Sequence, residues 1–508
     1  MKTLVFYLPQ FHRVKENDIW WGEGYTEWTA VRNAEPLFEG HYQQHVPLND
    51  NYYDLLQKDT MKWQADLMNN YGIDGLCIYH YYFKDGKKML EKPAENLLGW
   101  TDINIEFCFC WANQSWGRTW SKFSGINAWN EKEELKISDL SDDGILLKQD
   151  YGDVRDWEKH YRYLSAFFQD DRYIKINNCP IFLIHRFEDI YCFPQMKALW
   201  NKLSIEDGFD GIYFWGKDTD NSDYNGSYKA ETYSFELIKD KRIIDYSAHC
   251  KGIINRALLS DSKVVLCGNT GYDDTPRRGE NGYVIDGFDP DEFYRQMRML
   301  YYIAEKRKNE FVLINAWNEW GEGMHLEPDK RFGYRFLEAL KNAQLDFKDI
   351  SSEEIEYLEI TRKTLLQKKI VADKERLNKF QGINKILDKW LYIEQNGKRI
   401  TDYFLKNDYR NVAVYGYGIL GKHLVDELIA DGIGVSYIID RNPQKKDLRF
   451  KFMSIDSNLP EVDLVVITPL YDIYSIYLKL KECLSNPIIT IEEIIHNCCD
   501  EFMVGYNS

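Results

Sequence analysis

The chain has 508 residues, of which 44% are hydrophobic and 29% charged, and its formal net charge is −17. This length exceeds what one hydrophobic core supports, so we expect two or three domains. The 81 acidic side chains outnumber the 64 basic ones, which argues against nucleic acid as a partner. Aromatic residues reach 15%, and their flat faces with polar edges suit sugar rings.

The location of the protein is predicted from its apolar runs and its cysteines. No run approaches the ~18 uninterrupted apolar residues of a membrane-spanning helix, and the opening MKTLVFYLPQFHR is too short in its apolar part for a secretory signal. Four cysteines lie inside apolar strand-like runs without CxxC spacing, at 77, 108, 110 and 267. We therefore predict that the thiols are reduced and bind no metal, and that the protein is cytoplasmic. Peripheral association with the inner face of the membrane is a further alternative.

Short, nearly continuous apolar runs recur along the first two thirds of the chain and predict strands buried on both faces. Between them lie segments with helical periodicity, and Asp289, Pro290 and Glu292 form a typical helix start. Eight strands alternating with helices predict a (β/α)8 barrel of the TIM type over residues 1–345. The expected strands are 3–9, 72–82, 104–113, 179–186, 211–216, 230–235 (or instead 243–248), 263–269 and 311–320.

The remaining chain predicts a helical connector at 346–408, rich in Lys and Glu, and a small Rossmann-like parallel α/β domain at 409–508. In the second of these, GYGILG carries Gly416, Gly418 and Gly421 between a strand and a helix, and Asp440 follows 19 residues after Gly421. This spacing predicts a nucleotide or nucleotide sugar bound at the domain. A degenerate domain used for docking or oligomerisation is the alternative.

Polar and aromatic residues end the predicted barrel strands, where a (β/α)8 barrel carries its reacting groups. Convergence of these ends predicts a sugar-sized polar cleft with aromatic walls and no required cofactor. His80 and His185 lack the spacing of metal ligands, which favours hydrogen bonds to sugar or core. The predicted substrate-binding residues at strand ends are Gln10, His12, Tyr79, His80, Tyr81, Trp111, Asn113, His185, Trp215, Asn269, Asp273, Asn318 and Trp320.

The segment NAWNEWGEGMHLEP, residues 315–328, gives the sharpest prediction. Glu319 and Glu322 lie three residues apart beside glycines, and a pair of carboxylates is what acid/base work at a glycosidic bond requires. We predict that these two are catalytic. Glu327 is instead expected to be a solvated loop charge or an ion-pair partner.

Seven motifs follow one another along the first 345 residues. They are YLPQFH (7–12), WWGEGYTEW (20–28), HVPLN (45–49), GIDGLCIYHYYF (72–83), FCFCWANQSWGRTW (107–120), GNTGYDDTPRR (268–278) and NAWNEWGEG (315–323). In this order they resemble the WbsX-type glycosyltransferase family of bacterial polysaccharide loci. That family is in turn similar to glycoside hydrolase family 99, the endo-acting α-mannosidases. The motifs add Trp28, Trp116 and Arg118 to the expected substrate-binding residues.

The resemblance implies retaining chemistry through a 1,2-anhydro sugar, with Glu319 as the base on the 2-hydroxyl and Glu322 as the acid/base on the leaving or incoming oxygen. Gln114 stands where the family usually has Glu, and Asp274 stands where Asn is usual. These departures put the identity of the substrate in question more than the mechanism. We expect a glycosyltransferase of surface polysaccharide (O-antigen or capsule) biosynthesis acting on a free or lipid-linked carbohydrate. An α-glycan hydrolase and a non-catalytic sugar-binding protein are the alternatives.

Overall fold

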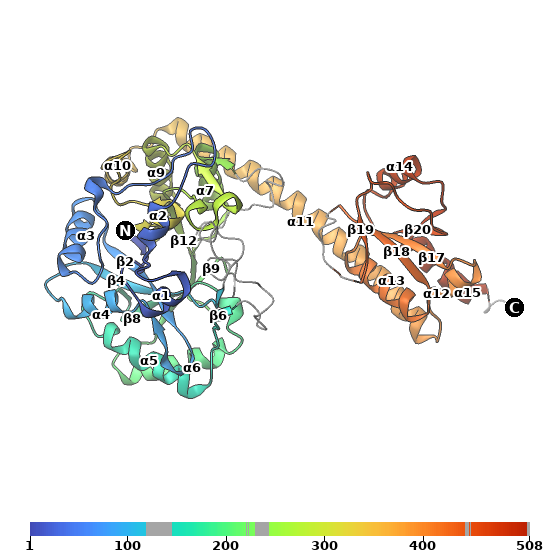
Figure 1. Cartoon of the computed structure of the whole chain (residues 1–508), viewed down its shortest axis with the longest axis horizontal. Helices are drawn as coiled ribbons and strands as arrows, with labels where there is room; N and C mark the ends of the chain where they lie inside the picture. The colour runs from blue at the N-terminus through green and yellow to red at the C-terminus, as the bar shows by residue number, and fades with distance from the viewer. Residues whose placement is uncertain are drawn as a thin grey trace. The chain divides into compact units, whose positions relative to one another are not determined.

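The computed structural model describes residues 1–117, 145–219, 221, 223–228, 243–441, 447 and 449–504. The chain forms two compact units, Met1–Leu365 and Leu366–Ser508 (Figure 1). Within the described ranges, no helix is both long and apolar enough to cross a membrane.

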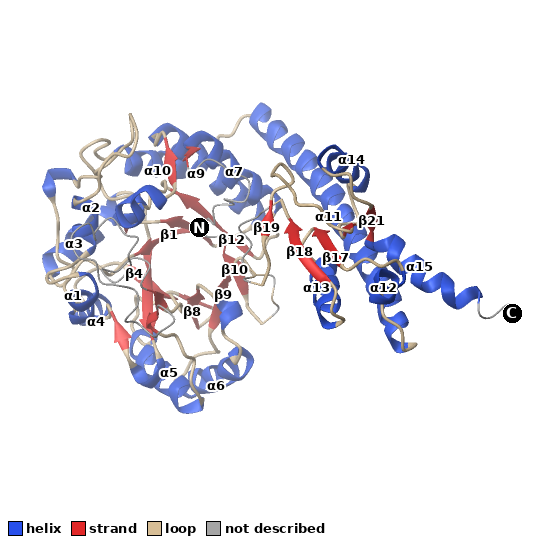
Figure 2. Ribbon diagram, turned by 45° about the vertical axis from the view of Figure 1, so that its right-hand side comes forward, coloured by secondary structure: helices blue, strands red, loops and turns tan. Residues whose placement is uncertain are grey.

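The first unit is a closed barrel of parallel strands, as the sequence predicts. β1 pairs with β2 on one side and with β14 on the other, which closes the ring. Figure 2 shows these strands as an inner ring surrounded by helices. In ring order the strands are β1 (Lys2–Tyr7), β2 (Gly75–Tyr82), β4 (Glu106–Trp111), β8 (Cys179–Ile184), β9 (Tyr213–Lys217), β10 (Gly226–Tyr228), β12 (Val264–Asn269) and β14 (Phe311–Asn315).

The sixth barrel strand differs from its prediction. The structure places β10, Gly226–Tyr228, between β9 and β12, whereas the expected strand at 230–235 lies outside the described residues. The alternative at 243–248 is wrong, because β11 (Ile243–Asp245) pairs with β13 (Val284–Asp286) outside the barrel and a helix begins at Tyr246. A three-residue strand beginning with glycine offers too short an apolar run to be recognised from sequence.

Amphipathic helices surround the barrel. α9 begins as expected, with Asp289 accepting a hydrogen bond from the N–H of Asp291 and Pro290 in the first position, whereas Glu292 bonds Arg295 instead of the helix start. The helices of this unit are α1 (Lys15–Trp21), α2 (Glu27–Arg32), α3 (Lys58–Asn70), α4 (Lys92–Gly99), α5 (Val154–Phe168), α6 (Phe193–Glu206), α7 (Tyr246–Leu259), α8 (Thr275–Arg278), α9 (Pro290–Arg307) and α10 (Arg335–Asp346).

Short elements decorate the loops at the strand ends. β15 (Asn318–Glu319) and β16 (Met324–His325) form a hairpin after β14, with the 3₁₀ turn η8 (Trp320–Glu322) between them. The other short strands are β3 (Lys88–Met89), β5 (Trp116–Gly117), β6 (Ile145–Leu147) and β7 (Lys175–Ile176), and the other described 3₁₀ turns are η1 (Leu48–Asp50), η2 (Lys84–Gly86), η5 (Phe187–Asp189) and η7 (Gly279–Asn281).

The second unit holds a five-stranded parallel sheet in the order β19-β18-β17-β20-β21. The long helix α11 (Ser352–Gln395) crosses from the first unit into the second, within the predicted connector. The three-part division predicted from sequence stays a prediction. The further elements are α12 (Thr401–Lys406), β17 (Asn411–Tyr415), α13 (Ile419–Ala430), β18 (Gly434–Ile439), β19 (Phe452–Met453), β20 (Leu464–Ile467), α14 (Ile473–Cys483), β21 (Ile488–Thr490) and α15 (Ile491–Val504).

Candidate active site

The two predicted catalytic glutamates lie together in the turn that follows β14. Glu319 ends β15 and Glu322 ends η8, and Gly323 then reverses the chain with φ at 62°. A Cβ at Gly323 would approach the backbone N of Asp273 to 2.9 Å, so only glycine fits here. The turn is therefore fixed against the loop after β12, and both carboxylates are held at the carboxyl-terminal end of the barrel.

A buried arginine joins the two glutamates to a third carboxylate. Arg277 of α8 donates through Nη1 to Glu322, and its Nη2 lies 3.3 Å from Oε2 of Glu319. Its Nε lies 2.8 Å from Oε1 of Glu27, which begins α2. The Glu27 side chain is 1% exposed and that of Arg277 12% exposed. One guanidinium thus serves three carboxylates in a nearly dry environment, where such charge-assisted bonds are strong.

Burial and neighbouring negative charges make the two glutamates hold protons more tightly than usual. Burial first, then the charge of Glu322, raise the pKa of Glu319 to about 8, although Arg277 opposes the rise. Burial also raises the pKa of Glu322 against the pull of Arg277. Burial alone would lower the pKa of Arg277, but the three carboxylates raise it well above its ordinary value. Raised carboxyl pKa values of this kind are typical of acid/base sites.

Residues at or beside the ends of three other barrel strands lie near the pair. Burial and the charge of Glu319 raise the pKa of both Tyr79 and Tyr81 in β2. Burial lowers the pKa of Lys217, which ends β9, while Glu322 counteracts part of this change. The His185 ring lies 6.5 Å from that of Tyr79, and burial lowers its pKa to about 3, so this histidine is neutral. The hydroxyl groups of Tyr79 and Tyr81 are thus hydrogen-bond donors near the two glutamates, and Lys217 is a cation whose charge depends on its surroundings.

Several predicted substrate-binding residues hold the turn that carries Glu319 and Glu322 through hydrogen bonds and close contacts. Asn318 accepts from the N–H of Leu8 at 2.7 Å and donates to its carbonyl at 3.0 Å, which ties the turn to β1. The N–H of Asp273 donates to the carbonyl of Glu322 at 2.6 Å. Asn269 is buried beside Met324, and its Nδ2 lies 3.5 Å from the Met324 sulfur. We infer that these residues position the glutamates.

Trp28 and Trp320 form an aromatic layer behind the turn. Their ring centroids lie 5.5 Å apart. The indole N–H of Trp28 donates to the carbonyl of Tyr53 at 2.8 Å, and Trp320 stacks on His325 at 3.7 Å. Both indoles are buried, so their apolar faces are used in packing.

Other predicted residues lie in the walls of the barrel. His80 shares a hydrogen bond of 2.8 Å with His160 of α5, and Trp111 packs on the same His160 ring at 4.8 Å. Asn113 donates to Tyr151 at 2.9 Å, and Trp215 lies 5.4 Å from the ring of Phe311. These four side chains are buried among protein groups.

The last four predicted residues have varied positions. The Trp116 ring lies 5.3 Å from that of Tyr81 and so belongs to the neighbourhood of the pair. His12 is buried, and the backbone carbonyl of Gln10 accepts from the N–H of Glu27 at the start of α2. Arg118 lies outside the described residues.

Sequence reasoning missed Glu27, Arg277 and Lys217. Glu27 lies in the motif WWGEGYTEW and Arg277 in the motif GNTGYDDTPRR. Their places in these two motifs could have identified this acidic residue and this basic residue as candidates for the site. Lys217 follows the strand-end residue Trp215 by two positions, the spacing at which side chains of a strand share a face.

One group of described residues has the composition of a metal site, namely His45, His325 and Asp329. His325 Nδ1 donates to the carbonyl of Glu327 at 3.0 Å, and its Nε2 faces His45 Nδ1 at 2.8 Å. Asp329 accepts from Tyr42 at 2.9 Å. Each of the three residues takes part in a hydrogen bond within the protein.

The predicted nucleotide-binding residues of the second unit also lie together. Gly416, Gly418 and Asp440 line a cavity of about 220 Å³, and Asp440 accepts from the N–H of Tyr417 at 2.9 Å. A Cβ at Gly421 would lie 2.0 Å from the carbonyl oxygen of Gly416, whereas one at Gly418 would meet no atom within 4 Å. Close packing therefore requires glycine at 421 but not at 418.

Comparison with known proteins identifies the relatives of the chain. Two curated proteins from Xanthomonas campestris pv. campestris, strains ATCC 33913 and B100, both named "Uncharacterized protein WxcX", are 30% identical over 373 residues. The match covers 69% of this chain and 51% of each relative, so the chain spans about half the length of these relatives.

The comparison with solved structures gives weak matches to two enzymes. The GH99 endo-α-mannosidase from Bacteroides thetaiotaomicron is 14% identical, with a TM-score of 0.43, over 68% of this chain and 97% of that one. A GH113 β-1,4-mannanase is 8% identical, with a TM-score of 0.32, over 57% and 94%. The family model described as "Glycosyltransferase WbsX" matches residues 3–235 and 221–340. The chain therefore belongs to the WbsX glycosyltransferase family.

Proposed function

We propose that the barrel is a retaining glycosyltransferase that uses Glu319 and Glu322, and that it acts in the synthesis of a bacterial surface polysaccharide. One observation carries the proposal: two buried carboxylates with raised pKa share the guanidinium of Arg277 in a member of the WbsX family. Such a pair can hold one proton and one charge side by side, which is what proton transfer at a glycosidic bond needs.

The proposed reaction has two steps at one sugar. Glu319 takes the proton of the 2-hydroxyl while O2 attacks C1, the bond from C1 to the leaving oxygen breaks, and Glu322 protonates that oxygen. The product is a 1,2-anhydro sugar. Glu322 then deprotonates an acceptor hydroxyl, whose oxygen opens the three-membered ring at C1, and Glu319 returns its proton to O2. C1 is inverted twice, so its configuration is retained.

The raised pKa of Glu319 supports its role as the base. A carboxylate with a pKa of about 8 is a stronger base than an ordinary one and approaches the optimum for work near neutral pH. Arg277 holds Glu322 beside it and reduces repulsion when both are ionised. Tyr79, Tyr81 and Lys217 would then donate to sugar oxygens near the reacting carbon.

Water and a sugar hydroxyl can both open the anhydro sugar, so hydrolysis is the competing outcome. The family's description as glycosyltransferases favours transfer. We also propose a cytoplasmic site of action, at the inner face of the membrane when the carbohydrate is lipid-linked.

Incubation of the full chain with candidate nucleotide sugars or lipid-linked sugars and a mannose-containing acceptor tests the proposal. Mass spectrometry should detect an acceptor longer by one sugar, and NMR should show retained configuration at C1. The Glu319→Gln variant is the control. Release of free reducing oligosaccharide from an α-mannan, with no acceptor extended, would show the protein to be a hydrolase.

A second proposal concerns the other unit, which we infer to be a Rossmann-like domain that binds a nucleotide or nucleotide sugar. Its sheet order, 3-2-1-4-5 in chain numbering of its strands, matches the first five strands of the dinucleotide-binding order 3-2-1-4-5-6. The cavity beside Gly418 lies at the start of α13, where backbone N–H groups favour phosphate. Because no packing requires glycine at 418, close approach of a ligand is a reason for it.

A further inference from the structure

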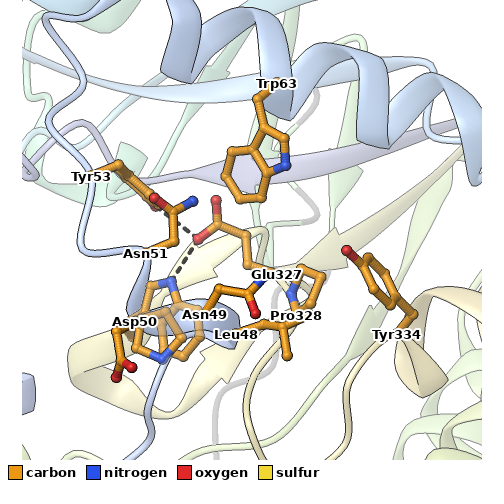
Figure 3. Close-up of a pocket in the computed structure, with 11 residues that line it drawn as sticks. Leu48, Asn49, Asp50, Asn51, Tyr53, Trp63, Glu327, Pro328 and Tyr334 are labelled. Carbon is orange, nitrogen blue, oxygen red and sulfur yellow. Dashed lines mark hydrogen bonds between the residues drawn. The ribbon is translucent and has the colours of Figure 1, made fainter.

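The barrel unit contains a cavity of about 310 Å³, and Trp320 of the aromatic layer forms part of its wall. Figure 3 shows Glu327 pointing into it between Tyr53 and Trp63, with Tyr334 across from them. The cavity is lined by Pro47, Leu48, Asn49, Asp50, Asn51, Tyr53, Trp63, Trp320, Glu327, Pro328 and Tyr334. Its volume is at the lower end of small-molecule sites, which suits a ligand the size of one sugar.

Trp320 separates this cavity from the catalytic pair. Its indole N–H donates to Oε2 of Glu327 at 2.6 Å, while its neighbours in sequence, Glu319 and Glu322, both bond Arg277. Trp320 lines the cavity, whereas Glu319, Glu322 and Arg277 do not. The cavity is therefore a separate feature that shares one wall with the catalytic turn.

The polar base of the cavity is rigid. Glu327 is 3% exposed and accepts from Tyr53 at 2.7 Å and from Gln64 at 2.6 Å in addition to Trp320. The expectation of a solvated charge or an ion pair at Glu327 is wrong, because all three donors are neutral groups of the protein. Burial raises its pKa to about 7. A carboxyl group held by three donors offers a fixed acceptor surface to a ligand.

The rim of the cavity is held in a defined conformation. Asn49 and Asp50 both have left-handed backbone angles, with φ at 60° and 55°, a costly state that persists only where the surroundings enforce it. The N–H of Leu48 donates to the carbonyl of Pro328 at 2.9 Å, and Lys330 holds Asp50 at 2.6 Å. The rim is thus bonded to residues 328–330, which follow the hairpin of β15 and β16.

Aromatic and amide groups make up the rest of the cavity. Trp63 of α3 is partly exposed, and Tyr334 is 40% exposed with one face stacked on Tyr71. No side-chain hydrogen bond is formed by Asn49 or Asn51 within the described chain. Flat aromatic faces beside amides that lack protein partners are the groups that bind the C–H faces and hydroxyls of a pyranose.

The charges of the cavity decide against an anionic ligand. Its eleven lining residues include the two acids Asp50 and Glu327 and no Lys, Arg or His. A phosphate, a nucleotide or a uronic acid would therefore meet like charge with no basic side chain among the residues that line the cavity. A neutral sugar meets no such penalty.

We propose that this cavity is an accessory binding site for one neutral pyranose unit of a glycan, separate from the catalytic centre. The geometry carries the site, whereas the carbohydrate class of the ligand rests on the proposed function. A glycan held there would contact Trp320 and the rim that continues from the catalytic hairpin, so binding would keep a polysaccharide beside the enzyme.

The test uses the full chain labelled with 5-fluorotryptophan. The ¹⁹F signal of Trp63 is assigned by its loss in Trp63→Phe. Methyl α-D-mannopyranoside and methyl α-D-glucopyranoside are the neutral probes, and methyl α-D-glucuronide is the anionic one. A neutral glycoside should shift the Trp63 signal saturably in the millimolar range typical of single small ligands, and the glucuronide should not.

Two tyrosine variants provide a matched comparison. Tyr334→Ala should weaken the glycoside-induced shift about ten-fold, a usual effect of removing an aromatic contact. Tyr474→Ala changes a tyrosine that is 75% exposed in the second unit and should leave the shift unchanged. An equal shift with the glucuronide, or no shift with either neutral probe at about 100 mM, overturns the proposal. Because no turnover is measured, this result is independent of whether the barrel transfers or hydrolyses sugars.

Discussion

Arg277 lies with its Nη2 3.3 Å from Oε2 of Glu319, although 42 residues separate them in the chain. The same guanidinium bonds Glu322 and Glu27. Its charge lowers the pKa of Glu319, whereas the charge of Glu27 raises it. The protonation of the proposed base is therefore balanced by two residues of opposite sign that need not contact the substrate.

Substitution of these two residues should move the pH profile in opposite directions. Glu27→Gln removes a negative charge, so the apparent pKa of Glu319 should fall by about one unit. Arg277→Gln removes a positive charge, so the same pKa should rise. The pH dependence of kcat/KM for transfer measures both shifts.

Arg277→Gln leaves buried carboxylates without a cation and should destabilise the fold by about 3–5 kcal/mol. Arg277→Lys keeps the charge and serves as the second variant, with a profile close to that of the natural protein. Shifts of the same sign in the Glu27 and Arg277 variants would contradict the balance described above.

The proposed catalytic roles of Glu319 and Glu322 predict large losses of turnover in their variants. Glu319→Gln and Glu322→Gln should each lower kcat by about 10²–10⁴-fold, because each removes a proton-transfer group. Glu327→Gln should lower it less than about ten-fold, since Glu327 bonds Trp320 and not the pair. Product formation under saturating substrate gives these rates, and near-natural turnover by either of the first two variants contradicts the assignment.

The pH profile tests which glutamate is the base. With Glu319 as the base, kcat/KM should have a limb that rises with pH through about 8, the pKa of this group. With Glu319 as the acid, activity would instead be lost as pH rises through the same value. A falling limb near pH 8 that disappears in Glu319→Gln would exchange the roles of Glu319 and Glu322.

Burial of Glu327 predicts a pH-dependent stability. Its pKa rises from 4.5 to about 7 on folding, so between these values the folded chain holds a proton that the unfolded chain has lost. The contribution of this group to the free energy of unfolding is therefore complete below pH 4.5. As pH rises from there to about 7, the free energy of unfolding should fall, by on the order of 1–3 kcal/mol.

Glu327→Gln should remove that decline. Urea unfolding of the natural chain and of the variant at pH 5 and pH 8 measures the difference, followed by tryptophan fluorescence. An equal change in unfolding free energy between the two pH values for both proteins would show that Glu327 does not titrate in this range.

Gly418 provides a clean test of the nucleotide proposal. A Cβ at this position meets no atom within 4 Å, so Gly418→Ala should keep the natural melting temperature. The same methyl group would occupy the cavity and should weaken nucleotide binding at least ten-fold. Calorimetry of the full chain with common nucleotides and nucleotide sugars measures this, and no heat from any of them favours docking or oligomerisation.

The sequence by itself determined seven of the eight barrel strands and the position of the carboxylates. Continuous apolar runs can only be buried on both faces, as in parallel strands covered by helices, and the hairpin that carries Glu319 and Glu322 follows directly from the eighth run. The parallel strands of the second unit follow from similar runs around 411–415 and 464–467.

The composition of the strand ends said less about which residues lie near the carboxylates, because alternate residues of a strand point to opposite faces. Tyr79 and Tyr81 face the carboxylates, whereas His80 between them bonds His160 of α5. Listing every polar residue at a strand end therefore mixed the two faces. Applying the two-residue period would have separated them and would have pointed to Lys217 beside Trp215.

Only the tertiary structure decided the electrostatics of the site. Glu27 and Arg277 lie 250 residues apart in the chain, and no local pattern links an acid in one loop to a base in another. The state of Glu327 likewise depends on Tyr53 and Gln64, which come from a distant segment. Burial and charge partners are set by which segments the closed barrel brings together, so they are properties of the fold and not of any motif.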